Sequence, residues 1–245
     1  MKVGLFIPCY IDQMYPEVAL STYKLLEKLG VDVEYPLDQT CCGQPLYNSG
    51  CFDECKPLAN KFIKIFKDFD YIVAPSGSCI SMVKHNYTKL DPDADKIYNK
   101  SYELVEFLHD VLKVEKLEAS FTGTVGIHNS CHAHRELNLA SKSELHESPY
   151  SKIRHLLSFV NDINIKPLNR VDECCGFGGT FSVNEPEVST QMGRDRLNDH
   201  IENGIEYITG VDVSCMMHMQ GLIDREKLPI KTIHISQILL GEESK

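Results

Sequence analysis

The feature that most constrains this chain is a cysteine pattern that occurs twice in the same order. Each copy has a single cysteine, then an adjacent pair followed by glycine, then another single cysteine. The first copy is Cys9, Cys41-Cys42-Gly43 and Cys79, and the second is Cys131, Cys174-Cys175-Gly176 and Cys215. The intervals are 31 and 36 residues in the first copy and 42 and 39 in the second, where 138–148 reads as a polar insertion. The pattern indicates an internal duplication.

The residues around the cysteines repeat as well. Short apolar runs typical of strands precede the cysteine groups, at 3–8, 31–37 and 71–75 in the first copy and at 125–130, 163–168 and 207–211 in the second. Apolar residues at helical spacing predict helices between the strands, at 16–29, 51–69 and 186–201. Each copy closes with a short apolar segment, at 102–108 and 232–240.

Strands that alternate with helices predict an α/β fold, here two tandem copies of a small parallel-sheet βαβ module. We expect the modules to span residues 1–118 and 119–245, with the boundary in a polar connection at 116–124. Ligands of open parallel sheets lie beyond the carboxyl ends of the strands. The three cysteine groups of each module should therefore meet at one edge of its sheet.

Composition narrows the class of protein. Apolar residues make up 42% of the 245 residues and charged residues 24%, which is typical of a folded globular chain. The formal net charge of −10 disfavours a nucleic-acid partner. The start of the chain lacks the apolar core of a signal peptide, and no apolar run is long enough to span a membrane. We expect a cytoplasmic protein, in which ten cysteines indicate metal or redox chemistry.

Adjacent cysteines suit metal binding better than a disulfide. Consecutive Cα atoms lie about 3.8 Å apart, whereas bridged cysteines prefer about 4.4–6.8 Å. The glycine after each pair allows a positive φ, or a close approach by inorganic sulfide. Four thiolates per module match a [4Fe–4S] cluster, a [2Fe–2S] cluster or a structural zinc. Ligands drawn from three separate loops favour an iron–sulfur cluster, and zinc in one module stays an alternative.

Other residues could contribute to these sites. Cys51 and Cys55 have no counterpart in the second copy and read as packing or surface thiols on a helix. Three histidines lie close in sequence to the cysteines and could replace or hydrogen-bond a ligand, or lie at the surface: His132, His134 and His218. The glycine-rich run 176–180 lacks the lysine of a Walker loop and reads as backbone room around a cluster.

At the repeated Cys-Cys-Gly the chain resembles the cysteine-rich domain family named for that motif, which includes the cysteine-rich subunit of heterodisulfide reductase and the iron–sulfur subunits of glycolate oxidase. The runs 39–45, 75–79, 174–183 and 212–215 are similar to the lactate utilization protein A family. This resemblance covers essentially the whole chain. It implies a role in oxidising L-lactate to pyruvate, as one of three subunits of a bacterial iron–sulfur system.

The resemblance also implies the ligands, with one cluster, of the [4Fe–4S] type, held in each module. The matching positions are Cys9, Cys41, Cys42 and Cys79, and Cys131, Cys174, Cys175 and Cys215. In the reductase each repeat usually ends in Cys-x-x-Cys, but here Ser76 and Asp212 occupy the first of those positions. Four rather than five thiolates disfavour the unusual non-cubane cluster of the reductase.

Three functions follow as hypotheses. The leading one is an electron-transfer subunit of an oxidoreductase complex, which is inactive alone and works with two other subunits, at least one of them an iron–sulfur protein. The second is a thiol-disulfide reductase. The third is a zinc-stabilised assembly protein without redox chemistry. No catalytic residue is assigned.

Overall fold

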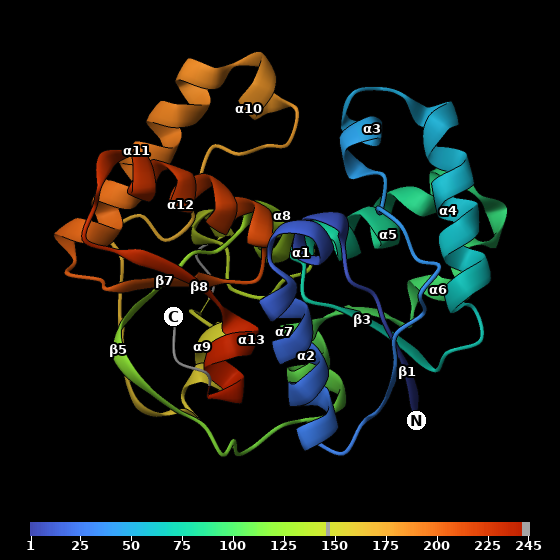
Figure 1. Ribbon diagram of the computed structural model, residues 1–245, viewed down its shortest axis with the longest axis horizontal. Helices are drawn as coiled ribbons and strands as arrows, with labels where there is room; N and C mark the ends of the chain where they lie inside the picture. Colours follow the sequence, from blue (N-terminus) through green and yellow to red (C-terminus); the bar gives the residue numbers. More distant parts are fainter. Residues whose placement is uncertain (146–147, 242–245) are drawn as a thin grey trace.

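The computed structural model describes residues 1–145 and 148–241 (Figure 1). The first half contains four strands: β1 (Lys2–Leu5), β2 (Asp32–Glu34), β3 (Tyr71–Ala74) and β4 (Ser101–Glu103). Its helices are α1 (Cys9–Met14), α2 (Pro16–Lys28), α3 (Gln44–Asn48), α4 (Phe52–Phe66), α5 (Gly77–Leu90), the 3-10 turn η1 (Pro92–Ala94), α6 (Asp95–Tyr98) and α7 (Leu104–Glu106), which continues as a π-helical turn η2 (Phe107–Val111).

The second half repeats this order. Its strands are β5 (Ser120–Ile127), β6 (Asn161–Lys166), β7 (Tyr207–Gly210) and β8 (Lys231–His234). Its helices are α8 (Cys131–Arg135), the 3-10 turn η3 (Ser143–Leu145), α9 (Lys152–Leu157), α10 (Phe181–Asn184), α11 (Pro186–Glu202), α12 (Val213–Glu226) and α13 (Ile235–Leu240).

The two halves form separate four-stranded sheets with the same topology. The strand orders are β2-β1-β3-β4 and β6-β5-β7-β8, and every neighbouring pair is parallel. The registers also agree, since Val3 pairs with Tyr71 in the first sheet and Val125 with Tyr207 in the second. The predicted α/β fold with a duplicated parallel-sheet module is therefore confirmed.

The ends of the modules differ in detail from the sequence prediction. The two closing segments each contribute a fourth strand, β4 or β8, followed at once by a helix. Strand β5 begins at Ser120, inside the segment predicted to be a polar connection, because Phe121 is buried and packs edge-on against Tyr207 at 5.1 Å between ring centroids. The predicted insertion at 138–148 lies between α8 and α9, and residues 146–147 of it lie outside the described residues.

The modules pack through reciprocal contacts. Helix α13 of the second module lies against α2 of the first, and α7 of the first lies against α9 of the second (Figure 1). Closer to the strand ends, α5 contacts α8 and α12 contacts α1. Equivalent elements thus meet in pairs, as they do across a two-fold interface. A large hydrophobic cluster runs through both modules, and a smaller one lies within the second module.

Gly77, the first residue of α5, lies where the backbones of the two modules approach each other closely. A Cβ atom there would lie 2.6 Å from the Cβ of Ala133 and 3.0 Å from Asp212 Oδ2. Only a glycine fits at this contact without moving α8.

We therefore expect Gly77→Ala to lower the free energy of unfolding by about 1–3 kcal/mol, because the added methyl overpacks the interface. Gly221→Ala is the matched control, since a Cβ at that helical glycine meets nothing within 4 Å. The control should raise stability by up to about 1 kcal/mol. Urea unfolding of both variants measures this, and equal stability of Gly77→Ala and the wild type would refute the tight contact.

Candidate metal centre

The single cysteines lie where helices begin, at the carboxyl ends of the central strands. Cys9 is the first residue of α1 and Cys131 the first of α8. Cys79 and Cys215 lie in the first turns of the longer helices α5 and α12. The N-terminal end of a helix carries partial positive charge, which stabilises a thiolate or an anionic cluster.

The adjacent pairs lie on loops that follow the edge strands β2 and β6. In the first module, the Gln39 amide fastens this loop to the end of β1, because it accepts from Ile7 N at 2.7 Å and donates to Leu5 O at 3.1 Å. Gly43 and Gly176 then turn the backbone with φ values of 82° and 87°. The turn aims each glycine N–H back at the first sulfur of the pair.

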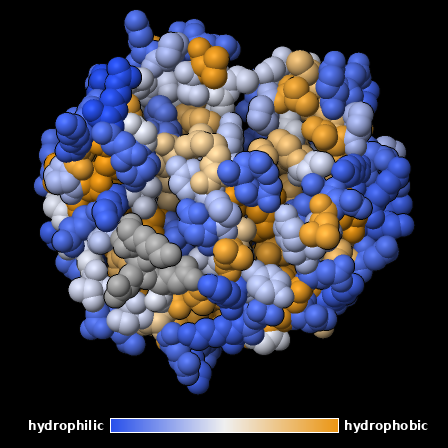
Figure 2. All heavy atoms as spheres, viewed as in Figure 1, coloured by the Kyte–Doolittle hydropathy of each residue, from blue (hydrophilic) through white to orange (hydrophobic). Residues whose placement is uncertain are grey.

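All eight predicted cysteines line one cavity of about 100 Å³ between the modules. The sequence predicted one site per module, and the structure brings the two sets into a common space. Gly178 and Gly179 also line it, which agrees with the reading of 176–180 as backbone room. Figure 2 is drawn from the same direction as Figure 1, and it shows a hollow in the surface between α3 and α10.

In the first module the four sulfurs form two close contacts. Cys9 Sγ lies 3.6 Å from Cys41 Sγ, and Cys42 Sγ lies 3.3 Å from Cys79 Sγ. Hydrogen bonds from Cys42 and Cys9 lower the pKa of Cys41, against the effect of burial, and Gly43 N–H adds a third donor at 3.4 Å. The hydrogen bond to Cys41, followed by burial, raises the pKa of Cys9. Its neighbours therefore favour the thiolate form of Cys41.

The second module repeats this electrostatic arrangement. Hydrogen bonds from Cys131 and Cys175 lower the pKa of Cys174, and Gly176 N donates to its sulfur at 3.3 Å. Hydrogen bonds to Cys174 and Cys215, with burial, raise the pKa of Cys175. In each site the hydrogen bonds thus favour the thiolate form of the first cysteine of the pair, and soft thiolate donors of this kind fit metal binding.

Ser76 and Asp212, which occupy equivalent positions in the two modules, contact one another across the interface. Ser76 Oγ donates to Asp212 Oδ1 at 3.1 Å, and Ser78 N donates to the same oxygen at 2.8 Å. Ser130 Oγ donates to the other carboxylate oxygen. Asp212 is 2% exposed, so its charge is held by these three donors. This buried carboxylate joins the modules next to the cysteines.

We expect Asp212→Ala to destabilise the fold by about 3 kcal/mol, because it removes charge-assisted hydrogen bonds and leaves buried donors unpaired. Asp224→Ala is the control: it lies on α12, the helix that Asp212 precedes, and its exposed carboxylate accepts a hydrogen bond from the Gln220 amide at 2.7 Å. That change should stay within about 0.5 kcal/mol. Chemical denaturation compares the two, and a similar loss in both would contradict the role of Asp212.

The remaining sequence candidates separate into those at the cavity and those away from it. His132 lines the cavity and meets Gln44 of the first module at 3.3 Å between Nε2 atoms. His134 instead lies 3.3 Å from Asp172, and His218 contacts Ser189 O at 3.2 Å. Neither of these histidines lines the cavity.

Cys51 and Cys55 also lie outside the cavity lining. Cys55 is buried on α4 and donates to Gly43 O at 3.5 Å, while Cys51 is the half-buried residue before α4 begins. Their positions agree with the packing interpretation.

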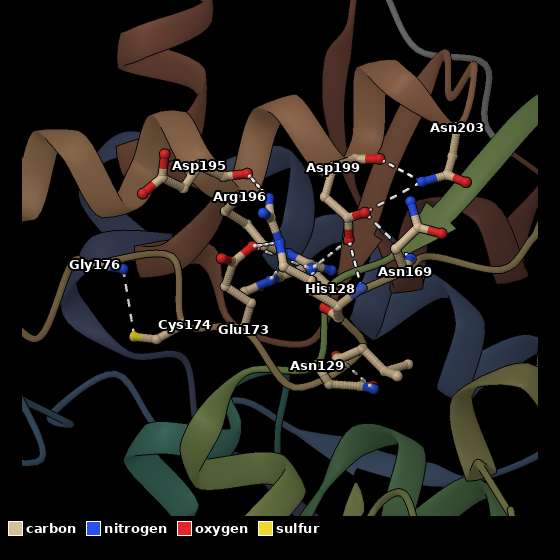
Figure 3. A network of polar contacts seen from close by, with 12 residues as sticks. His128, Asn129, Asn169, Glu173, Cys174, Gly176, Asp195, Arg196, Asp199 and Asn203 are labelled. Carbon is tan, nitrogen blue, oxygen red and sulfur yellow. Dashed lines mark hydrogen bonds and ion pairs between the residues drawn. The ribbon is translucent and has the colours of Figure 1, made fainter.

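His128 lines the cavity and was not among the sequence candidates. It follows β5 directly, three residues before Cys131, and belongs to a buried polar network with Arg196 and Asp199 (Figure 3). One ring nitrogen lies within 4.8 Å of the Cys175 and Cys215 sulfurs. A histidine where the first copy has Phe6 was the only available signal in the sequence.

His200 lies close to this network, on α11, and is neutral when the protein is folded. Burial, followed by the positive charge of Arg196, lowers the pKa of His200 from 6.5 to about 2. The unfolded chain therefore binds one more proton than the folded chain between those values. Stability rises with pH in this window and is lost as the pH falls below 6.5.

We expect His200→Phe to flatten this acid loss by up to about 1.4 kcal/mol per pH unit, because phenylalanine cannot bind the proton. Phenylalanine fits the position, since Phe66 packs against Gly4 in the first module as His200 does against Gly126 in the second. The free energy of unfolding in urea, measured at several values between pH 4 and 7, gives the slope for both proteins. Identical slopes would show that His200 titrates in the folded state.

The duplicated parallel module with paired cysteines at its strand ends defines a class of protein, the cysteine-rich CCG domain proteins. That domain family matches residues 3–84 and 125–220. The chain belongs, more narrowly, to the lactate utilization protein A family. It is 41% identical to the Bacillus pumilus protein of that name, over 98% of this chain and 99% of the relative, and 40% identical to the Oceanobacillus iheyensis protein over 98% and 96%.

Among solved structures, a hypothetical protein from Helicobacter pylori is similar in fold. It has a TM-score of 0.58 at 12% identity, and the match covers all of this chain and 50% of that one. This likeness concerns the fold alone. No helix among the described residues is long and apolar enough to cross a membrane.

Proposed function

We propose that this chain holds an iron–sulfur cluster in each module and transfers electrons within a multi-protein system that oxidises L-lactate to pyruvate. The single observation that carries the proposal is the convergence of eight cysteines on one cavity. The modules that supply them correspond to residues 1–118 and 119–245. The relatives' name, lactate utilization protein A, supports the pathway.

The residues present fit such clusters. Each module offers four sulfurs: Cys9, Cys41, Cys42 and Cys79 in the first, and Cys131, Cys174, Cys175 and Cys215 in the second. Gly176, at a φ of 87°, turns its N–H toward the Cys174 sulfur at 3.3 Å. Four thiolates match a [4Fe–4S] cluster, the type that the resemblance implies, and such a cluster would supply one-electron transfer when bound.

The chain's own residues then control access and charge. Gly43 N–H and Gly176 N–H donate to the sulfurs of Cys41 and Cys174, which favours the thiolate form of each. Buried Cys42 and Cys175 keep the inner side of the cavity away from water. Because both sets of sulfurs line one cavity, electrons could pass between the two centres without leaving the protein. The lactate-oxidising chemistry and the electron acceptor belong to two partner subunits, at least one of them an iron–sulfur protein.

Iron and acid-labile sulfide content of anaerobically purified protein tests this proposal. We expect about two clusters per chain, and about half of that iron in Cys42→Ser or in Cys175→Ser, because each replacement removes a ligand from one module only. Cys51→Ser is the control and should retain full iron, since Cys51 lies outside the cavity lining.

Stoichiometric zinc without sulfide would overturn the proposal in favour of a zinc-stabilised assembly protein. Full iron in both Cys42→Ser and Cys175→Ser would overturn the assigned ligands. Disulfide reductase activity of the isolated chain, lost in Cys175→Ser, would instead favour the thiol-disulfide enzyme.

A further inference from the structure

The two modules differ in the side chains of the core next to their cysteine groups. In the first, three phenyl rings fill this space: Phe6 meets Phe62 at 4.9 Å and Phe66 at 5.9 Å between ring centroids. All three rings are buried. They belong to the same hydrophobic core as Cys42 and Cys79, and none of them lines the cavity.

The second module has polar side chains at the equivalent positions. Phe6 and His128 correspond, because each lies three residues after the strand residues Val3 and Val125 that share one register. The other two positions correspond through the strand glycines. A Cβ on Gly4 would contact Phe66 and a Cβ on Gly126 would contact His200, so Phe66 and His200 correspond. Phe62 and Arg196 lie four residues before them in the sequence and therefore correspond as well.

Arg196 fixes the protonation of the His128 ring. Its Nε donates to His128 Nδ1 at 3.2 Å, and its Nη1 donates to Arg170 O and to Asp199 Oδ2 (Figure 3). A guanidinium has donors only, so Nδ1 must accept. Burial, followed by the charge of Arg196, lowers the pKa of His128 to about 3. The neutral ring therefore carries its proton on Nε2.

The Nε2–H of His128 lacks a hydrogen-bond partner among the described residues although it is buried. A ring nitrogen of His128 lies within 4.8 Å of the sulfurs of Cys175 and Cys215, and Arg196 already occupies Nδ1. An unpaired buried donor costs about 1–3 kcal/mol. A sulfur atom of a bound centre would satisfy it.

We propose that His128 donates its Nε2–H to a sulfur of the second-module centre and does not ligate iron, and that this makes the second centre the one of higher reduction potential. The inference rests on the proposed function. A hydrogen bond to sulfur stabilises the more negative, reduced form of a centre. The first module has Phe6 at the position of His128, and a phenyl ring offers no such donor. Electrons therefore move from the first module to the second.

The tautomer is tested in the reduced, metal-free full-length chain. In ¹⁵N NMR at pH 7, we expect His128 to show a protonated Nε2 and an unprotonated Nδ1, assigned by loss of the signals in His128→Phe. A protonated Nδ1 would overturn the proposal, because Nε2 would then be free to ligate metal.

The potential is tested by redox titration of the loaded protein monitored by EPR, with the second-module signal identified as the one lost in Cys175→Ser. His128→Phe should shift that signal to lower potential and leave the first-module signal in place. His128→Gln keeps an N–H donor and should restore much of the shift. His200→Phe is the control, since it makes the same change nearby but away from the cavity.

The outcomes separate the two proposals. Wild-type protein without sulfide would overturn the proposed function and this inference together. Two clusters whose potentials are unmoved by His128→Phe would overturn the inference alone. Loss of the second cluster in His128→Phe but not in Cys51→Ser would show ligation by His128, and would also overturn it.

Discussion

The arrangement of this protein depends on one constraint, that the carboxyl ends of two parallel sheets face each other across a shared interface. Parallel strands place the following loops and helix starts at one edge of a sheet. When two such edges meet reciprocally, as α5 meets α8 and α12 meets α1, every cysteine group arrives at the same cavity. The site is thus a product of the interface and not of either sheet alone.

The buried Asp212 carboxylate makes this interface specific. An isolated charge at such depth would be strongly unfavourable, but Ser76, Ser78 and Ser130 supply three donors from both modules. The hydrogen bond between Ser76 and Asp212 can form because the two residues occupy equivalent positions in the two modules, and these positions meet near the pseudo-two-fold axis. Ser76 and Asp212 carry no thiol, and both are used for hydrogen bonding between the modules. This is a physical reason to expect four sulfurs per site.

The sequence predicted the duplication, the parallel sheets and the eight cysteines because these depend on local pattern: apolar runs, turns and spacing. It did not predict the common cavity, since nothing local in Cys79 or Cys131 encodes how two modules pack. It also placed a polar connection where β5 begins, because Phe121 looks isolated until its contact with Tyr207 is known. The sequence did not predict His128 as a site residue for the same reason, because its partner Arg196 is 68 residues away along the chain.

The two duplicated modules differ in the side chains at the positions of Phe6, Phe62 and Phe66. Phe6, Phe62 and Phe66 form the kind of core that a small α/β module needs, so the first module represents the simpler solution. In the second module, Asp199 and the two backbone carbonyls of Arg170 and Ile127 accept hydrogen bonds from the buried Arg196. Such a network contributes little to stability compared with phenyl rings, because desolvation offsets the Coulombic gain. The network lies next to the second-module sulfurs and has no counterpart at the equivalent phenyl positions of the first module. This difference is explained if the two centres must differ in reduction potential.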